Sequence, residues 1–361
     1  MTKKLLVAGA TLALISSCTM KNPLLTESSA PFGAPEFDKI EDAHYLPAFE
    51  AAIAEAKAEI DAIVANPDEP TFENTIEAME YAGETLDRVA GIFYNLMEAN
   101  TNDAMQETAE QISPMLTEYS MYVSLNNDLF QRVKAVYEKK DELGLEKDQM
   151  RILEDNYKGF VRGGANLSDE DKALYSKLSE ELSLVTLQFS KNVLAATNAY
   201  TLHVTDEADL AGLPEFVRTM AAETAAEKGL EGWAFTLQAP SYSPFMKYSQ
   251  NRELRKQLWI AYNSRAVGGE FDNSDIVKQI IDLRIKIANI LGYETYADYA
   301  LEDRMAKTTP TVNEFIKNLL EPSMKYAKKD VADVLAYAKK NGFEYRVHSN
   351  TPQLKQRKPE M

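Results

Sequence analysis

The sequence contains a single cysteine, Cys18, and only three histidines, His44, His203 and His348. One cysteine excludes a disulfide framework, so a hydrophobic core must hold the fold together. No two of the histidines are four residues apart, the spacing that lets one face of a helix bind zinc. The common helical zinc motif is therefore missing from these 361 residues.

Other signatures of catalysis are missing as well. There is no Gly-x-Ser-x-Gly turn and no Walker-type phosphate loop. The pairs Gly163-Gly164 and Gly268-Gly269 follow no predicted strand, so we expect them to be turns. The acidic pairs Glu180-Glu181 and Glu302-Asp303 are expected on solvated helix faces. We therefore assign no catalytic residue.

The three histidines are not expected to form a metal site, because zinc needs three or four converging ligands. His44 opens a helix and is expected to hydrogen-bond there, next to Glu41 and Asp42. His203 occupies the polar phase of a predicted strand, and His348 lies near the C-terminal end. We assign no metal ligand.

Positive charge is scarce. The 39 Lys and Arg face 56 Asp and Glu, which gives a formal net charge of −17. No basic stripe offsets this charge, so nucleic acid is excluded as a partner, and attraction to anionic lipids is not expected. Apolar residues make up 45% of the chain, which is typical of a soluble globular protein with one large domain or two smaller ones.

The only long apolar run, Leu5 to Ile15, lies near the N-terminus behind Lys3 and Lys4. It is shorter than the ~20 residues that cross a bilayer, and it is typical of a signal peptide. The following Ile-Ser-Ser-Cys resembles the bacterial lipobox, in which the cysteine receives a diacylglycerol. We expect residues 1–18 to be a lipoprotein signal peptide and Cys18 to be the lipid anchor. An ordinary secretory signal is the alternative.

This segment predicts the protein's location. We expect an exported protein that contacts the membrane only through its anchor and faces the periplasm of a Gram-negative bacterium. Without residues 1–18, which carry two lysines and no acids, the formal charge is near −19.

Helical periodicity covers most of the chain, so we predict an all-α fold with a small antiparallel β insertion near residues 200–240. Residues 19–43 are rich in turn residues and are predicted to be a tether with an extended lead into the first helix. An N-terminal helical region is predicted for 44–198, and the β insertion with a second helical region for 199–343. Residues 344–361 form an aberrant basic tail, which is either a natural C-terminus or out-of-frame sequence.

Capping residues and breakers predict where the helices begin and end. One helix is expected from Thr71 and Asn74 through Leu96, and Pro322 is expected to kink or split a later one. Helical patterning resumes at Pro244 after the β insertion. The remaining predicted starts are Ser168 with Asp171, Asn273, and Thr311 with Glu314.

Several short motifs, in order along the chain, resemble the zinc oligopeptidases of family M3, which include peptidyl-dipeptidases and thimet-type oligopeptidases. The resemblance runs from about Asn22 to Phe343. The motifs are Asn22-Pro23-Leu24-Leu25, Pro31-Phe32-Gly33-Ala34-Pro35-Glu36-Phe37, His44-Tyr45-Leu46-Pro47-Ala48-Phe49, Pro70-Thr71-Phe72-Glu73-Asn74-Thr75-Ile76, Phe160-Val161-Arg162-Gly163-Gly164-Ala165, Asn251-Arg252-Glu253-Leu254-Arg255, Leu291-Gly292-Tyr293, Tyr296-Ala297-Asp298-Tyr299 and Arg304-Met305-Ala306.

The resemblance implies the large N-terminal lobe of a two-lobed helical enzyme with a peptide channel. Such an enzyme uses one zinc ion to hydrolyse oligopeptides, and the peptidyl-dipeptidases release C-terminal dipeptides. Zinc in the family is held by His-Glu-x-x-His, which this chain lacks. We therefore expect a truncated peptidase, inactive alone, whose catalytic domain and C-terminal half are missing.

Two alternatives remain open. The chain is either a non-catalytic helical lipoprotein that binds peptides or a partner, or one half of a split peptidase. Six tyrosines would pack in the core by default, and in a peptidase they would alternatively line the channel: Tyr242, Tyr248, Tyr262, Tyr293, Tyr296 and Tyr299.

Overall fold

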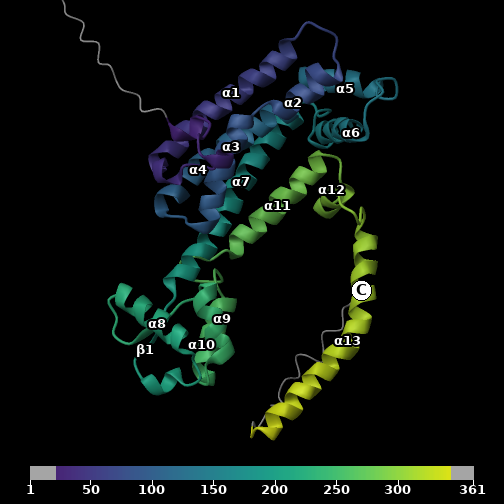
Figure 1. The fold of residues 1–361 in the computed structure, drawn as a ribbon. Helices are drawn as coiled ribbons and strands as arrows, with labels where there is room; N and C mark the ends of the chain where they lie inside the picture. The colour runs from purple at the N-terminus through teal and green to yellow at the C-terminus, as the bar shows by residue number, and fades with distance from the viewer. Residues whose placement is uncertain (1–21, 343–361) are drawn as a thin grey trace, which may run out of the picture. The chain divides into compact units, whose positions relative to one another are not determined.

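The computed structural model describes residues 22–342 and divides into two units, one ending at Gly292 and one starting at Tyr293. The described residues are mostly helical, with one two-stranded antiparallel sheet, so the predicted fold class is confirmed (Figure 1). Within this part of the chain, no helix is long and apolar enough to cross a membrane. Residues 1–18 with Cys18, and the tail with His348, lie outside the described residues.

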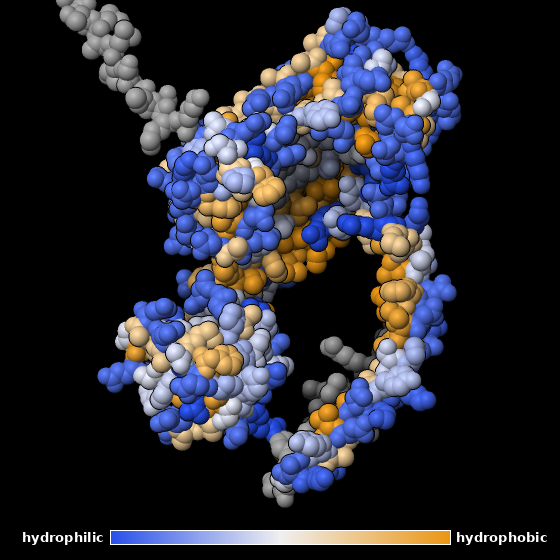
Figure 2. All heavy atoms as spheres, viewed as in Figure 1, coloured by the Kyte–Doolittle hydropathy of each residue, from blue (hydrophilic) through white to orange (hydrophobic). Residues whose placement is uncertain are grey.

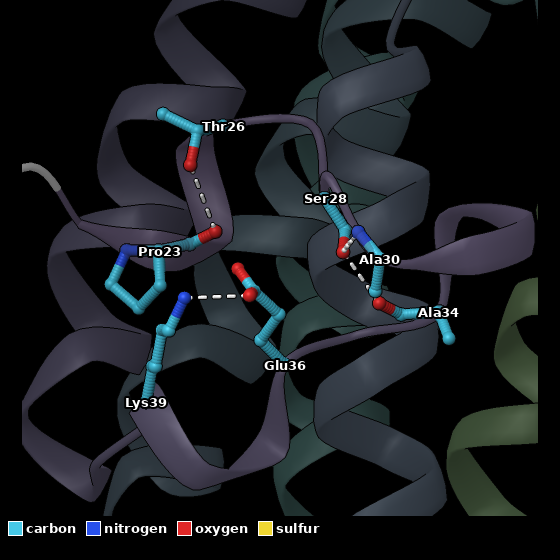
Figure 3. Close-up of polar contacts among 7 residues, drawn as sticks. All are labelled: Pro23, Thr26, Ser28, Ala30, Ala34, Glu36 and Lys39. Atoms are coloured by element: carbon cyan, nitrogen blue, oxygen red, sulfur yellow. Dashed lines mark hydrogen bonds and ion pairs between the residues drawn. The ribbon is translucent and has the colours of Figure 1, made fainter.

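The N-terminal arm, residues 22–43, is folded into turns, so the extended lead predicted here is wrong. Leu24 anchors the arm, with only 1% of its surface exposed. The side chain of Ser28 closes the arm's loop by donating to the carbonyl of Ala34 at 2.6 Å and accepting from the N–H of Ala30 at 3.1 Å (Figure 3). The turns are 3₁₀ helices at Pro23–Leu25, Pro31–Gly33, Phe37–Lys39 and Asp42–His44.

Helices up to α7 build two adjoining cores. The first lies between α1, α3 and α4, where the rings of Phe49 and Phe93 meet edge to face at 5.5 Å. The second lies under α5 and α6, around Leu129 and Leu153. The elements are α1 (Tyr45–Ala65), the π-helix η5 (Phe72–Glu77), α2 (Ala78–Tyr81), α3 (Glu84–Ala99), α4 (Asp103–Ser124), α5 (Asn127–Glu138), α6 (Lys147–Arg162) and α7 (Asp169–Ala199).

The single helix predicted from Thr71 to Leu96 is divided into η5, α2 and α3. The predicted cap is correct, because Thr71 and Asn74 exchange side-chain hydrogen bonds with each other's backbone. The break is at Gly83, whose φ of +88° is left-handed and whose N–H donates to the Glu59 carboxylate at 2.7 Å. A contact with α1 therefore overrides the helical periodicity at this position.

The β insertion has its own core. Strands β1 (Leu202–Val204) and β2 (Trp233–Phe235) pair antiparallel, as predicted, and their register places Leu202 opposite Phe235. They pack with η6 (Glu207–Leu210), α8 (Glu215–Glu227), α9 (Ala239–Tyr248) and α10 (Arg252–Asn263). Helix α9 begins at Ala239 rather than at Pro244, because Pro240 in its first turn favours a helix start.

Helix α11 (Ser274–Ile290) packs along α7, where Leu283 and Ile287 meet Tyr175 and Leu178. Asn273 precedes α11 but makes no side-chain cap, so its predicted capping role is wrong. Its amide instead donates to the carbonyl of Phe189 at 3.0 Å and accepts from Asn192 at 2.9 Å. Asn273, 4% exposed, therefore joins α11 to α7.

The second unit contains α12 (Tyr296–Glu302) and α13 (Thr309–Lys340). Helix α13 starts earlier than predicted, with Thr308 accepting from the N–H of Thr311 as its cap. Pro322 lies inside α13 without splitting it. No side chain of α12 or α13 is buried.

Candidate functional site

The described histidines do not come together. The ring Nδ1 of His44 accepts the N–H of Glu41 at 2.9 Å, which confirms its predicted role at a helix start. His203 is exposed, and its Nε2 is 2.6 Å from the carbonyl of Glu231. Across residues 22–342, no three His, Cys, Asp or Glu side chains are grouped so that they could hold a metal ion. The residues that are present therefore do not fit the zinc site that the sequence resemblance implies.

The six tyrosines fall into separate places. Tyr242 and Tyr262 stack at 4.0 Å within the core of the β insertion, with the Arg265 guanidinium 3.8 Å from the Tyr262 ring. Tyr248 is 37% exposed. In the second unit, Tyr299 contacts both Tyr293 and Tyr296. The default of core packing holds for Tyr242 and Tyr262.

The predicted turns and acidic faces are confirmed. Gly163-Gly164 ends α6, and Gly268-Gly269 lies in the loop before α11. Glu180-Glu181 on α7 and Glu302-Asp303 at the end of α12 are all exposed.

A groove of about 410 Å³ lies between α4 and α7. We call it the α4–α7 groove. Its floor is apolar, and its rim carries charges of both signs. The lining residues are Thr117, Glu118, Met121, Tyr122, Leu125, Ser176, Lys177 and Glu180.

Helix α1 fixes one side of this groove. Lys57 pairs with Glu118 at 2.7 Å and lies 5.2 Å from the centre of the Tyr122 ring. The Tyr122 hydroxyl donates to Asp61, and this hydrogen bond is the main cause of its raised pKa. Two side chains of α1 therefore hold Glu118 and Tyr122 in place. The groove has the apolar floor and convergent polar groups of a ligand site.

Helix α11 exposes a second apolar face. Leu283 and Ile287 pack on α7, whereas Val277, Ile281 and Ile285 are 41%, 53% and 44% exposed. We call these three the α11 stripe; their spacing of four residues places them in one row. Figure 2 shows apolar side chains gathered over this helix. A helix that is apolar on two sides is normally covered on both.

Sequence reasoning missed the α11 stripe, because a periodicity search reports the one face that repeats best. The available signal was the number of apolar residues in α11, which exceeds what one face needs. Helix α13 likewise exposes apolar residues along one side (Figure 2). They include Phe315, Ile316, Leu319, Leu320, Val331, Val334 and Tyr337.

Comparisons with known proteins agree with the sequence resemblance. Residues 49–172 match the family model "Neurolysin/Thimet oligopeptidase, N-terminal domain", and residues 245–351 match "Peptidase family M3". The second match extends into the basic tail expected from residue 344 onward.

Relatives match most of the chain. Dipeptidyl carboxypeptidase of Escherichia coli is 37% identical over 320 residues, covering 88% of this chain and 47% of that protein. Oligopeptidase A of the same organism is 33% identical over 325 residues, covering 89% of this chain and 47% of its own length. Organellar oligopeptidase A of Arabidopsis thaliana is 31% identical over 328 residues, which cover 89% of this chain and 41% of that protein.

The chain spans about half the length of these relatives. The two family models lie in order along it, and the model that names an N-terminal domain matches the helical region from α1 to the start of α7. This chain belongs to peptidase family M3 and carries its N-terminal region.

Proposed function

We propose that this chain is the helical, substrate-confining half of a zinc oligopeptidase that releases dipeptides from the C-terminus of short peptides. The observation that carries the proposal is the 37% identity to a dipeptidyl carboxypeptidase over 88% of the chain. This chain covers only 47% of that relative. The coverage supports the proposal that the zinc chemistry belongs to the part of the enzyme that this chain does not match.

The zinc ligands, in this proposal, lie outside these 361 residues. Both described histidines already hydrogen-bond to backbone groups, His44 within its own turn and His203 with the carbonyl of Glu231, and the described acidic residues form no cluster with them. The ligands are supplied by polypeptide that continues this chain or by a separately encoded polypeptide, as in a split peptidase. The chain alone is therefore inactive.

The apolar faces of the two units support the proposal. The α11 stripe and the exposed side of α13 each leave a row of large apolar side chains uncovered. We propose that the catalytic half covers part of this surface. The α4–α7 groove, with its apolar floor and charged rim, suits an extended peptide.

The experiment has a genetic and a biochemical arm. Reading all frames downstream of codon 343 should reveal a polypeptide with His-Glu-x-x-His. The purified chain with zinc should release no dipeptide from a peptide with a free C-terminus, and co-expression with that second polypeptide should restore release. Chelator-sensitive release by the chain alone would overturn the proposal, and so would the absence of any such downstream or separate half.

A second candidate function is a non-catalytic lipoprotein that binds peptides. The α4–α7 groove is the observation that favours it. The chain alone would then be monodisperse, melt cooperatively and bind short peptides, and filling the groove with Ser176→Trp would abolish binding. A chain that aggregates or melts without cooperativity would contradict this alternative.

We also propose that the protein is exported and anchored through Cys18. The expected product begins with acylated Cys18 and fractionates with membranes, while Cys18→Ser loses the lipid. Mass spectrometry of the N-terminal peptide distinguishes the two. An N-terminal peptide that still carries Met1, or an unmodified Cys18, would rule the anchor out.

A further inference from the structure

A small cavity of about 80 Å³ lies between the N-terminal arm and α3. A water molecule accounts for roughly 30 Å³ of liquid, so the space holds a few waters or one small molecule. The arm contributes most of the lining, including Thr26, Ser28 and Glu36, which Figure 3 labels, and α3 contributes Arg88 and Ile92 from successive turns. The polar side chains of the lining are Thr26, Ser28, Glu36 and Arg88, and its large apolar ones are Leu24, Ile40 and Ile92.

The hydroxyl groups at this cavity have no proton to offer a ligand. The Ser28 hydroxyl donates to the carbonyl of Ala34 at 2.6 Å, and the Thr26 hydroxyl donates to the carbonyl of Pro23 at 3.3 Å (Figure 3). Each hydroxyl carries a single hydrogen. They hold the arm in shape, and any hydrogen bond to a ligand must come from elsewhere.

The acidic group at the cavity is already paired. The carboxylate of Glu36 accepts a hydrogen bond from Lys39 Nζ at 2.6 Å (Figure 3). This contact raises the pKa of Lys39, so the ammonium stays charged and offsets Glu36 at neutral pH.

Arg88 is the remaining charged side chain at the cavity. It is half-buried, and in the described part of the chain it makes no ion pair or hydrogen bond; its Nε is out of reach of solvent. A guanidinium offers five N–H donors and accepts nothing. A partly desolvated cation without a partner is costly, so a bound anion would stabilise this arrangement.

We propose that this cavity binds a small aliphatic monocarboxylate, with acetate as the simplest example. The guanidinium of Arg88 pairs with the carboxylate, whose two oxygens match its planar fork. The alkyl part contacts Leu24, Ile40 and Ile92, which make the rest of the wall apolar. Phosphate fits poorly, because its second charge would find no further donor there.

The test measures binding of three probes to the purified full chain at constant ionic strength. Saturation-transfer NMR follows acetate, its uncharged analogue acetamide, and competition by inorganic phosphate. Acetate should bind with a Kd on the order of 1 mM, as a single charged contact in a small cavity allows. Acetamide should bind about tenfold more weakly, because it lacks the charge. Equal binding of acetate and acetamide, no binding at all, or displacement by phosphate at lower concentration would overturn the proposal.

Variants localise the site. Arg88→Met removes the donor and Ile92→Phe fills the cavity while keeping Arg88, so each should weaken acetate binding about tenfold or more. Arg151→Met is the matched control, since Arg151 is exposed on α6 and pairs with Asp155. Its acetate affinity should equal that of the parent. If one cavity variant does not fold, the other decides, and parental affinity in a folded Arg88→Met or Ile92→Phe chain would refute the assignment.

Discussion

Gly83 shows how one residue redirects the chain. It has a φ of +88°, and a Cβ placed on it would lie 3.4 Å from the Tyr119 hydroxyl and 3.7 Å from the Ala56 Cβ. A side chain there would adopt the left-handed conformation at a cost, although its Cβ would make only ordinary van der Waals contacts with α1 and α4. The turn between α2 and α3 therefore depends on glycine.

We predict that Gly83→Ala destabilises the protein by about 1–2 kcal/mol. Gly91→Ala is the matched control, because Gly91 lies inside α3 and a Cβ added to it would meet no atom within 4 Å. That change should stabilise by about 0.5–1 kcal/mol, since alanine favours a helix interior. Urea unfolding of both variants checks the prediction. Equal effects of the two substitutions would contradict it.

Tyr119 gives a pH-dependent prediction. Burial is the main cause of its raised pKa, with smaller contributions from Asp87 and Glu59. A raised pKa means that the folded state keeps the phenolic proton longer than the unfolded state. The resulting stability is complete below the unfolded pKa of about 10 and is lost as pH rises through the folded value.

Above pH 10 the parent should therefore lose stability faster than Tyr119→Phe does. Unfolding free energies measured from pH 8 to pH 11.5 check this. At pH 8 the unfolding free energies of the two proteins should differ little, because Tyr119 of the parent is then protonated in both the folded and the unfolded state. Parallel curves across the range would show that Tyr119 does not contribute.

At the scale of elements, the contact between α7 and α11 shows that capping rules do not predict side-chain hydrogen bonds between helices. Asn273 stands where a cap is expected, yet its amide group links the two helices by donating to Phe189 and accepting from Asn192. The partners lie more than 80 residues away in sequence, so no local pattern reveals them. The same limit applies at Gly83, where a hydrogen bond to Glu59 on α1 accompanies the end of a helix that its own periodicity would continue.

Asn273→Asp separates the two roles of this residue. As a cap, aspartate would be as good as asparagine. As a link, it loses the N–H donors to Phe189, and we expect a destabilisation of about 2 kcal/mol. The control is Asn126→Asp, because Asn126 uses only its oxygen to cap α5 by accepting from the N–H of Leu129 at 3.0 Å. That variant should be neutral or slightly more stable by chemical denaturation.

Local patterns predicted other elements well. The α1 periodicity places Phe49, Ile53 and Ile60 in the core, and the alternation in β1 places Leu202 and Val204 inward. These predictions succeed because a single buried face decides the pattern. The break at Gly83 and the link made by Asn273 depend on neighbours that are distant in sequence. The candidate groove was not predicted for the same reason, since it needs α1, α4 and α7 together.

At the scale of the whole molecule, exposed apolar surface competes with a large negative charge. The formal charge of −17 keeps copies of the chain apart at low salt, and salt screens that repulsion. The α11 stripe offers a surface on which two copies associate once repulsion is screened. Association should therefore rise with ionic strength.

We predict that Val277→Gln with Ile281→Gln suppresses this salt-dependent association in sedimentation velocity between 0.05 and 0.5 M NaCl, roughly a threefold change in Debye length. Its stability should stay within about 0.5–1 kcal/mol of the parent, because both side chains are already about half exposed. Ile287→Gln, at a position only 5% exposed, should instead cost about 2–4 kcal/mol. Unchanged association of the double variant would show that the contact lies elsewhere.

The β insertion leaves and rejoins the helical body at neighbouring points. The Arg265 guanidinium donates to the Thr197 hydroxyl at 3.1 Å, so the ends of the excursion are closed by a hydrogen bond. Its core draws only on residues between Tyr200 and Tyr262. A segment whose ends are adjacent and which has its own hydrophobic core is typical of an inserted subdomain. We therefore expect that it can be exchanged between homologues while the contacts between α7 and α11 are kept.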